Sequence, residues 1–188
     1  MTHTLANWLM RQLGWQVQGK LPKGQSYVLV AGPHTSNWDF VLGILARTAL
    51  GERIRFLGKH QLFRFPVGWF FRWLGGYPVH RHQQNNLVEQ VVAYFKNEPG
   101  FVLGLAPEGT RSPVTRWKLG FYHIAKAAAV PYVLVGFDYQ KKCFVISEPI
   151  YPGDDMATDL AQIAAFYQSV QGKYSKKVPD YLGYPPAS

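Results

Sequence analysis

The stretch 26-SYVLVAGPHTSNWDFVLGILARTAL-50 decides the fold, because one apolar run passes through a short polar turn into a second apolar run. The first run, 26–32, is rich in Val and Leu, which is typical of a buried strand. The second run, 37–50, predicts a helix that begins near Ser36 or Asn37, either of which can act as N-cap. A strand that turns directly into a helix is a building unit of α/β proteins.

The same alternation continues along the chain. Further strands are predicted at 53–58, 77–80, 101–105, 131–139 and 142–150, and further helices within 60–74 and at 84–97, 118–129 and 157–174. Strands rich in Val and Leu with helices between them favour a parallel sheet that is buried on both faces. The sequence therefore predicts one α/β domain with a largely parallel, mixed sheet covered by helices on both faces.

Two shorter segments flank the predicted domain of residues 19–177. Residues 1–18 predict an N-terminal amphipathic helix, in which Arg11 lies opposite apolar residues at mixed helical spacing: Leu5, Trp8, Leu9, Leu13 and Trp15. Such a helix either lies on a membrane surface or docks on the domain, and the sequence leaves both open. The segment 178–188 is rich in Pro and is expected to be irregular.

The composition limits the cellular compartment and the class of protein that can be expected. Cys143 is the single cysteine of the 188 residues, which excludes an intramolecular disulfide and favours a reducing compartment. No apolar run reaches the roughly 18 to 20 residues of a spanning helix, and the first residues do not resemble a signal peptide. We therefore expect a cytoplasmic protein that is soluble or peripheral on the inner face of the membrane.

The net charge of +9 favours an anionic partner. Residues 53–88 contain no Asp or Glu, but they interleave basic residues with aromatic ones: Arg53, Arg55, Lys59, Arg64, Arg72 and Arg81 with Phe56, Phe63, Phe65, Trp69, Phe70, Phe71 and Trp73. Trp and Arg suit the membrane–water interface and Phe suits the acyl region, so an anionic membrane surface is favoured over nucleic acid. An ordinary core helix with surface arginines remains the alternative.

A first polar cluster follows the first predicted strand, where ligands bind in α/β folds. His34 lies five residues before Asp39, and the turn into the helix can bring the imidazole within hydrogen-bond reach of the carboxylate. A carboxylate on one ring nitrogen fixes the tautomer and leaves the other nitrogen as a proton acceptor. The alternative is a capping turn with a surface histidine.

Two more polar clusters are predicted at the same edge of the sheet, beyond the carboxyl ends of the strands. The segment 107-PEGTRSP-113 follows the strand 101–105, and Arg81 follows the strand 77–80. Glycine in such a loop allows close approach of a ligand, and Arg111 can bind phosphate with a fork of donors. Two arginines at neighbouring strand ends predict a phosphate-sized anion site beside a histidine base.

The clusters together resemble a known family. His34 and Asp39 match the HxxxxD motif of the glycerophospholipid acyltransferases, the family of 1-acylglycerol-3-phosphate acyltransferase. The segment 75-GGYPVHR-81 resembles the second motif of that family, 107-PEGTRS-112 the third, and 130-VPYVLV-135 the fourth, which is mostly a structural strand. The four motifs occur in family order.

Two positions depart from the family pattern. Pro33 stands where the family usually has Asn, and Ala106 where it usually has Phe. Neither departure removes a chemical group to which a role is assigned, but both are compatible with a different acceptor.

The resemblance implies an enzyme that transfers a fatty acyl group from a thioester to a lysophospholipid hydroxyl, in phospholipid biosynthesis. It implies His34 as general base and Asp39 as its orienting carboxylate, with the acceptor bound by Arg81, Glu108, Gly109, Thr110 and Arg111. It implies no bound cofactor, with acyl-CoA or acyl carrier protein as the co-substrate. No metal site is expected either, because Arg81 beside the histidine pair His80 and His82 disfavours a cation. Five aromatic residues are then expected to insert into the membrane or to line the acyl groove: Phe63, Phe65, Trp69, Phe70 and Trp73.

Other functions remain open at this point. The acceptor is most simply 1-acylglycerol-3-phosphate, but another lipid acceptor fits an anionic pocket beside a base. A lipid or thioester hydrolase would use water as the acceptor, and water needs no phosphate clamp. A non-catalytic lipid-binding module would have no use for the set of His34, Asp39, Glu108 and Arg111.

Overall fold

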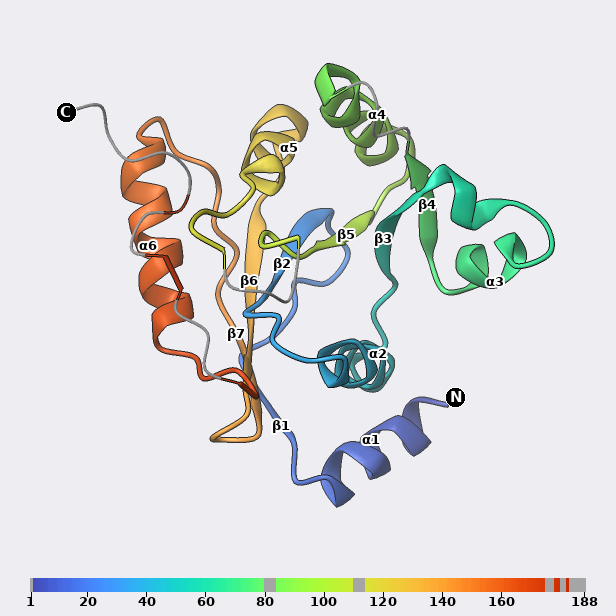
Figure 1. The fold of residues 1–188 in the computed structure, drawn as a ribbon, viewed down its shortest axis with the longest axis vertical. Coiled ribbons are helices and arrows are strands. Elements are labelled where there is room, and N and C mark those ends of the chain that lie inside the picture. Colours follow the sequence, from blue (N-terminus) through green and yellow to red (C-terminus); the bar gives the residue numbers. More distant parts are fainter. Residues whose placement is uncertain (1, 80–83, 110–113, 175–177, 180–181, 183–188) are drawn as a thin grey trace.

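The described part of the chain (residues 2–79, 84–109, 114–174, 178–179 and 182 of the computed structural model) contains a seven-stranded sheet with the order β1-β7-β6-β2-β5-β3-β4 (Figure 1). The strands are β1 (Gln16–Gln18), β2 (Tyr27–Gly32), β3 (Ile54–Lys59), β4 (Gly76–Val79), β5 (Val102–Leu105), β6 (Tyr132–Asp138) and β7 (Cys143–Ile146). All neighbouring strands pair in parallel except β6 and β7, which are antiparallel. The predicted largely parallel, mixed sheet is confirmed.

Strand β2 lies at the centre, with β5 on one side and β6 on the other. Both partners run parallel to it, and Val30 pairs with Leu105 and with Leu134. Because the carboxyl ends of parallel strands meet at one edge of a sheet, the chain segments that follow β2, β5 and β6 gather there. This register places the polar turns of the sequence beside one another.

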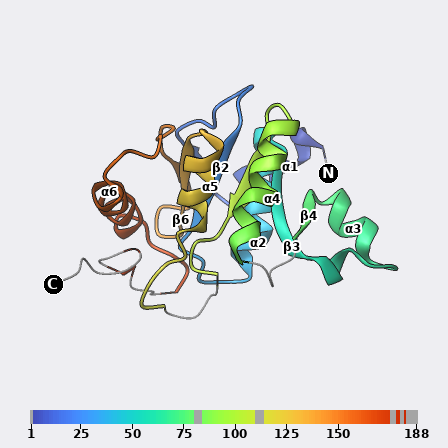
Figure 2. The ribbon, with the colours of Figure 1, turned by 90° about the horizontal axis from the view of Figure 1, so that it is seen from above.

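Helices cover both faces of the sheet. Helices α1 (His3–Gln12) and α2 (Trp38–Leu50) pack on one face, and α4 (Gln84–Asn97), α5 (Gly120–Ala128) and α6 (Met156–Gln168) pack on the other (Figure 1). The 3₁₀ helix η1 (His60–Phe63) and the short helix α3 (Gly68–Trp73) lie beyond β4, and α3 and α6 stand at opposite extremes of the molecule (Figure 2). Among the helices of the described residues, none is both long enough and apolar enough to cross a bilayer.

The alternation of side chains along the strands explains the two cores. Val28 and Val30 of β2 pack with α4, α5 and α6, whereas Tyr27 and Leu29 pack with α1 and α2. Successive strand residues point to opposite faces, so a continuous apolar run is what a sheet covered on both faces requires.

Both ends of the chain contribute to these cores. Helix α1 buries Ala6 and Met10 against α2, while Trp8 is exposed. The predicted N-terminal helix therefore docks on the domain through one side, and residues 16–18 of the same segment form strand β1. In the Pro-rich segment 178–188, Val178 and Leu182 are buried in the core beneath α4, α5 and α6.

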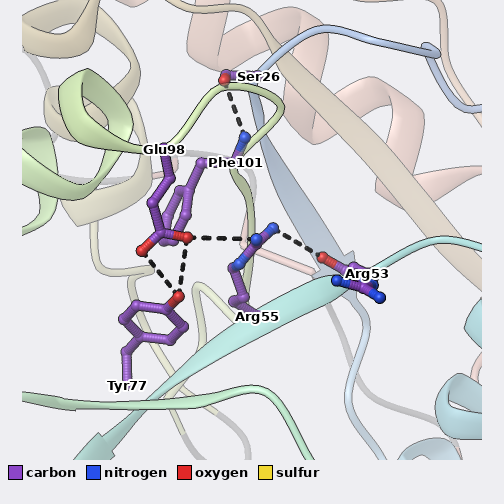
Figure 3. A network of polar contacts seen from close by, with 6 residues as sticks. All are labelled: Ser26, Arg53, Arg55, Tyr77, Glu98 and Phe101. Atoms are coloured by element: carbon purple, nitrogen blue, oxygen red, sulfur yellow. Dashed lines mark hydrogen bonds and ion pairs between the residues drawn. The ribbon is translucent and has the colours of Figure 1, made fainter.

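A polar network holds the β3–β4 edge to the rest of the sheet (Figure 3). Glu98 accepts hydrogen bonds from the Tyr77 hydroxyl at 2.8 and 2.9 Å and forms an ion pair with Arg55 at 3.3 Å. Near it, the Phe101 backbone N–H donates to Ser26 Oγ over 3.0 Å. The network joins β3, β4 and the turn before β5, and it fixes the position of Arg55.

Candidate active site

The turn between β2 and α2 is closed by the carboxylate of Asp39. Its Oδ2 accepts hydrogen bonds from the backbone N–H groups of Thr35 and Ser36 at 2.7 and 2.8 Å, and the residue is 1% exposed. Helix α2 begins beside this turn as predicted, with Asn37 at the N-cap position and Ser36 Oγ accepting from Trp38 N at 3.2 Å. Asp39 therefore braces the segment that carries His34.

Tyr139 makes a third hydrogen bond to the same carboxylate. Its hydroxyl donates to Oδ1 of Asp39 over 2.5 Å, and Trp15 packs edge-on against its ring with centroids 5.0 Å apart. The sequence analysis did not identify Tyr139. The residue ends the predicted strand 131–139, but the contact depends on β6 lying beside β2, which the sequence does not reveal.

Glu108 joins the second predicted cluster to the first. Its Oε2 accepts a hydrogen bond from the backbone N–H of His34 at 2.9 Å, and the side chain is 3% exposed. The next residue, Gly109, has φ +65°, and a Cβ atom there would lie 3.2 Å from Lys118 Nζ. Glycine is favoured at such a φ, and Lys118 is a cation beside this loop that the sequence analysis did not single out.

A pocket of about 170 Å³ lies between α2 and the sheet, and both His34 and Asp39 line it. The ring of His34 packs edge-on against Phe137, with centroids 5.5 Å apart. The rest of the wall is mainly apolar and comes from α2, five strands and Leu21 of the segment before β2: Leu21, Leu29, Ala31, Phe40, Gly43, Ile44, Ala46, Leu50, Ile54, Phe56, Gly104, Val135, Phe137, Phe144 and Ile146. The arrangement places a histidine and a carboxylate in the wall of an apolar chamber.

Two arginines also line the pocket. Arg47 lies eight residues after Asp39 along α2, a distance of about 12 Å at the helical rise per residue. Its Nη1 donates to the carbonyl oxygens of Ile54 at 3.1 Å and Leu74 at 2.8 Å, and burial lowers the pKa of its guanidinium. Arg55 forms the ion pair with Glu98 described above. Both guanidinium groups are thus held by acceptors of the protein.

The strand order corrects one prediction about the anion site. Arg81 and Arg111 were expected at neighbouring strand ends, but β3 lies between β4 and β5. Three strand spacings separate β4 from β2, or about 14 Å. The strand that precedes Arg81 is therefore not a neighbour of the strands that precede His34 and Arg111. Arg81, Thr110 and Arg111 themselves lie outside the described residues.

The segment after α6 crosses the His34 turn. Tyr174 N donates to Thr35 Oγ1 at 3.4 Å, and a Cβ atom at Gly172 would lie 2.6 Å from Thr35 Cγ2. Lys173 Nζ lies 5.4 Å from the ring centroid of Trp38, within the range of a cation–π contact. Residues 170–174 therefore form a strap over the turn between β2 and α2.

The structure does not favour the cysteine as a nucleophile, and the described residues form no metal site. Cys143 is buried, and burial raises the pKa of its thiol, which disfavours the thiolate needed for nucleophilic attack. Among the residues that the structure describes, no group of three or more His, Cys, Asp or Glu side chains could hold a metal ion.

Comparison with known proteins identifies the family and the fold. Residues 14–138 match the family model described as Acyltransferase, which is well over half of the chain. The fold resembles the crystal structure of the 1-acyl-sn-glycerophosphate (LPA) acyltransferase, PlsC, from Thermotoga maritima, with a TM-score of 0.55 and 22% identity over 84% of this chain and 70% of that chain. A search of curated proteins gave no match. The chain belongs to the acyltransferase family.

Proposed function

We propose that this chain transfers a fatty acyl group from an acyl thioester to the free hydroxyl of a lysophospholipid, with 1-acylglycerol-3-phosphate as the preferred acceptor. The apolar pocket lined by His34 and Asp39 supports this function best. An apolar chamber suits a fatty acyl chain, because burying each methylene contributes about 0.8 kcal/mol. The name of the Thermotoga PlsC structure, an acyltransferase of 1-acyl-sn-glycerophosphate, supports the choice of acceptor.

In the proposed reaction His34 acts as the general base. It takes the proton of the acceptor hydroxyl while the hydroxyl oxygen attacks the carbonyl carbon of the thioester. The carbon–sulfur bond then breaks, and the leaving sulfur takes the proton from the imidazolium, which gives an ester and a free thiol. A positioned base of this kind contributes about 10² to 10⁴ in rate. Asp39 stabilises the imidazolium through its charge.

The proposed acceptor site continues from the same turn. Because Glu108 accepts from the backbone of His34, the residues that follow it in the chain begin beside the proposed base. We assign Glu108, Gly109, Thr110 and Arg111 to the acceptor, with Arg111 on its phosphate. Arg81 remains part of this proposal as a second phosphate ligand. The donor is acyl-CoA or acyl carrier protein, both of which are acidic and suit the net charge of +9.

We further propose that the protein is peripheral on the inner face of the cytoplasmic membrane. The segment from η1 to α3 presents Phe65, Trp69 and Trp73 with exposed fractions of 97%, 69% and 72%. Exposed Arg64 and Arg72 accompany them, a combination that suits an anionic lipid surface. The expectation that Phe63 inserts into the membrane is wrong, because Phe63 is 5% exposed and packs beneath Arg72. Phe63 does not line the pocket either.

Thiol release by the purified protein on phospholipid vesicles tests the function. The assay uses acyl-CoA or acyl carrier protein thioesters, with and without 1-acylglycerol-3-phosphate, and compares His34→Ala with His123→Ala, an exposed histidine of α5. We expect release that requires the lysolipid, yields the diacyl product and falls at least about 100-fold in His34→Ala alone. Release that is indifferent to the lysolipid would instead establish a thioester hydrolase.

A further inference from the structure

Tyr139 places a phenol against the carboxylate of Asp39, which lines the same pocket as the proposed base His34. The two oxygens of Asp39 are engaged differently, because Oδ2 accepts two backbone N–H groups and Oδ1 accepts the Tyr139 hydroxyl at 2.5 Å. The backbone contacts anchor the carboxylate, so the phenol is not needed to hold it in place. Its remaining effect is electronic: a hydroxyl that donates to a carboxylate takes up part of the negative charge.

The surroundings keep the phenol in this role. Burial raises the pKa of Tyr139 well above its usual value, and the hydrogen bond to Asp39 raises it further. The hydroxyl therefore remains a donor throughout the neutral and moderately alkaline range. Trp15 packs against the ring, and the backbone N–H of Tyr139 donates to the carbonyl of Gln171 at 2.8 Å. Ring and backbone are thus both fixed by neighbouring segments.

We propose that Tyr139 is a positioning residue of this site, whose hydroxyl withdraws charge from Asp39 and thereby keeps His34 uncharged and ready to accept a proton. A full carboxylate charge beside an imidazole favours the imidazolium, and an imidazolium cannot act as a base. The phenol weakens that attraction without removing the carboxylate. The proposal rests on the proposed function, since it needs His34 as the base of the acyl transfer.

Other titratable groups near the site stay the same when the hydroxyl is removed, among them Arg47 and Arg55 in the pocket wall and Lys118 beside Gly109. Glu108 approaches from the loop after β5, and Tyr174 approaches from the strap. Asp138 precedes Tyr139 and pairs with Lys141 at 3.4 Å. Because these groups are unaltered by Tyr139→Phe, a change in the titration of His34 reports on the lost hydroxyl.

The chain offers a matched control far from the pocket. The Tyr122 hydroxyl on α5 donates to Oδ2 of Asp159 at 2.8 Å, and the same oxygen accepts from the backbone N–H of Gly153 at 2.7 Å. Tyr122→Phe therefore removes a phenol from an aspartate that is also held by backbone, just as Tyr139→Phe does. Any loss of activity that stems from general destabilisation of the fold should occur in both variants.

The first measurement is the pH profile of kcat/KM for the full chain with each variant. We expect the acid limb of Tyr139→Phe to move to higher pH by about one unit, with activity about tenfold lower below neutral pH. The rate should recover at alkaline pH, and Tyr122→Phe should follow the wild-type profile. An equal loss at every pH, or the same shift in Tyr122→Phe, would overturn the proposal because either result indicates a structural role.

A second measurement does not depend on turnover. The His34 imidazole of the unliganded protein is titrated by NMR, with its resonance assigned by comparison with His34→Gln. We expect a higher pKa for His34 in Tyr139→Phe than in wild type and no change in Tyr122→Phe. An unchanged His34 pKa in Tyr139→Phe would reject the proposal even if acyl transfer is established. A raised pKa would uphold the electronic effect of the phenol even if the chain transfers no acyl group.

Discussion

The backbone N–H of His34 donates a hydrogen bond to Oε2 of Glu108 across 2.9 Å, and this bond joins two turns that lie 74 residues apart in the sequence. The two residues follow β2 and β5, which are parallel neighbours. The geometry of the proposed base is therefore tied to the loop assigned to the acceptor. A carboxylate at this place serves the backbone of the His34 turn, a role that the sequence analysis did not assign to it.

Substitutions at Glu108 should separate this structural role from a role in acceptor binding. Glu108→Gln keeps a carbonyl oxygen that can accept from His34, so we expect a loss of unfolding free energy of no more than about 1 kcal/mol. Glu108→Ala removes the acceptor of a partly buried N–H and opens a cavity at a buried side chain, with an expected loss of about 2 to 4 kcal/mol. Urea unfolding of both variants measures the difference. Equal losses in the two variants would contradict the structural role of the bond.

The sequence predicted most of the local elements, because most strands are apolar runs bounded by turn residues. Strand β1 (Gln16–Gln18, sequence QVQ) is the exception: it lies within residues 1–18, which were predicted as a helix, and its mainly polar sequence gives no strand signal. Strand β2 begins at Tyr27 and ends at Gly32, within the predicted 26–32. The helix predicted within 60–74 is broken into η1 and α3, since Pro66 lacks the N–H that a continuous helix needs. The helix predicted at 157–174 ends at Gln168, and residues 170–174 form the strap.

Strand order limited what the sequence could say about the site. His34, Asp39 and Glu108 lie at one edge of the sheet as expected, because the strands before them are parallel and adjacent. Tyr139 was missed, and β4 and β5 were wrongly expected to be neighbours, for the same reason: hydropathy patterning indicates which segments are strands but not which strands are neighbours. The contacts of Asp39 with Tyr139 and of β4 with β3 both follow from that order.

Filling the pocket from Gly43 should shorten the acyl chain that the protein accepts. Gly43 lines the pocket, and a Cβ atom there would meet Phe137 at an ordinary 3.8 Å, so the backbone tolerates a side chain. A Gly43→Leu side chain adds four carbon atoms to the pocket. Displacing two methylenes of the acyl chain already corresponds to about tenfold, so we expect a loss of at least about tenfold in kcat/KM for a palmitoyl thioester. An octanoyl thioester should retain its rate. Equal losses with both thioesters would show that the chain lies elsewhere.

Two controls accompany the Gly43 experiment. Gly43→Ala adds a methyl group in ordinary contact and favours the helix by about 1 kcal/mol, so it should raise the unfolding free energy and leave the palmitoyl rate nearly unchanged. Ala165→Leu places the same leucine on the exposed side of α6 and should change neither rate.

Serine substitutions at Phe65 and Trp69 should weaken binding to anionic vesicles. The two side chains are 97% and 69% exposed, so their removal costs the fold little while removing apolar surface that the membrane would bury. We expect the dissociation constant of the double variant for phosphatidylglycerol vesicles, measured by sedimentation, to rise at least about tenfold. A tenfold change corresponds to about 1.4 kcal/mol of binding free energy. The double variant Trp69→Ser with Phe70→Ser should also bind the vesicles more weakly. Phe70 also stacks on Trp73, so that pair needs its unfolding checked.

The matched control for the membrane surface is Tyr151→Ser, at an aromatic residue with 63% exposure that follows β7. It should bind vesicles as wild type does. Binding by the Phe65 and Trp69 double variant that equals the control, with both proteins folded, would exclude this surface from membrane attachment.

A methyl group at Gly172 should push the strap away from the His34 turn. The new Cβ atom would lie 2.6 Å from Thr35 Cγ2, a distance that side chains avoid, and we expect Gly172→Ala to lose about 1 to 3 kcal/mol of unfolding free energy. Because the strap crosses the segment between His34 and Asp39, kcat should fall as well. Thr35→Ala removes the opposing methyl group, so the Gly172→Ala/Thr35→Ala double variant should regain most of the lost stability and most of the lost kcat.

Gly120→Ala provides the control, because nothing lies within 4 Å of the added Cβ atom. This variant should lose neither stability nor kcat. If the double variant is as impaired as Gly172→Ala alone, the contact between strap and turn does not transmit the effect, and the strap acts on stability by another route.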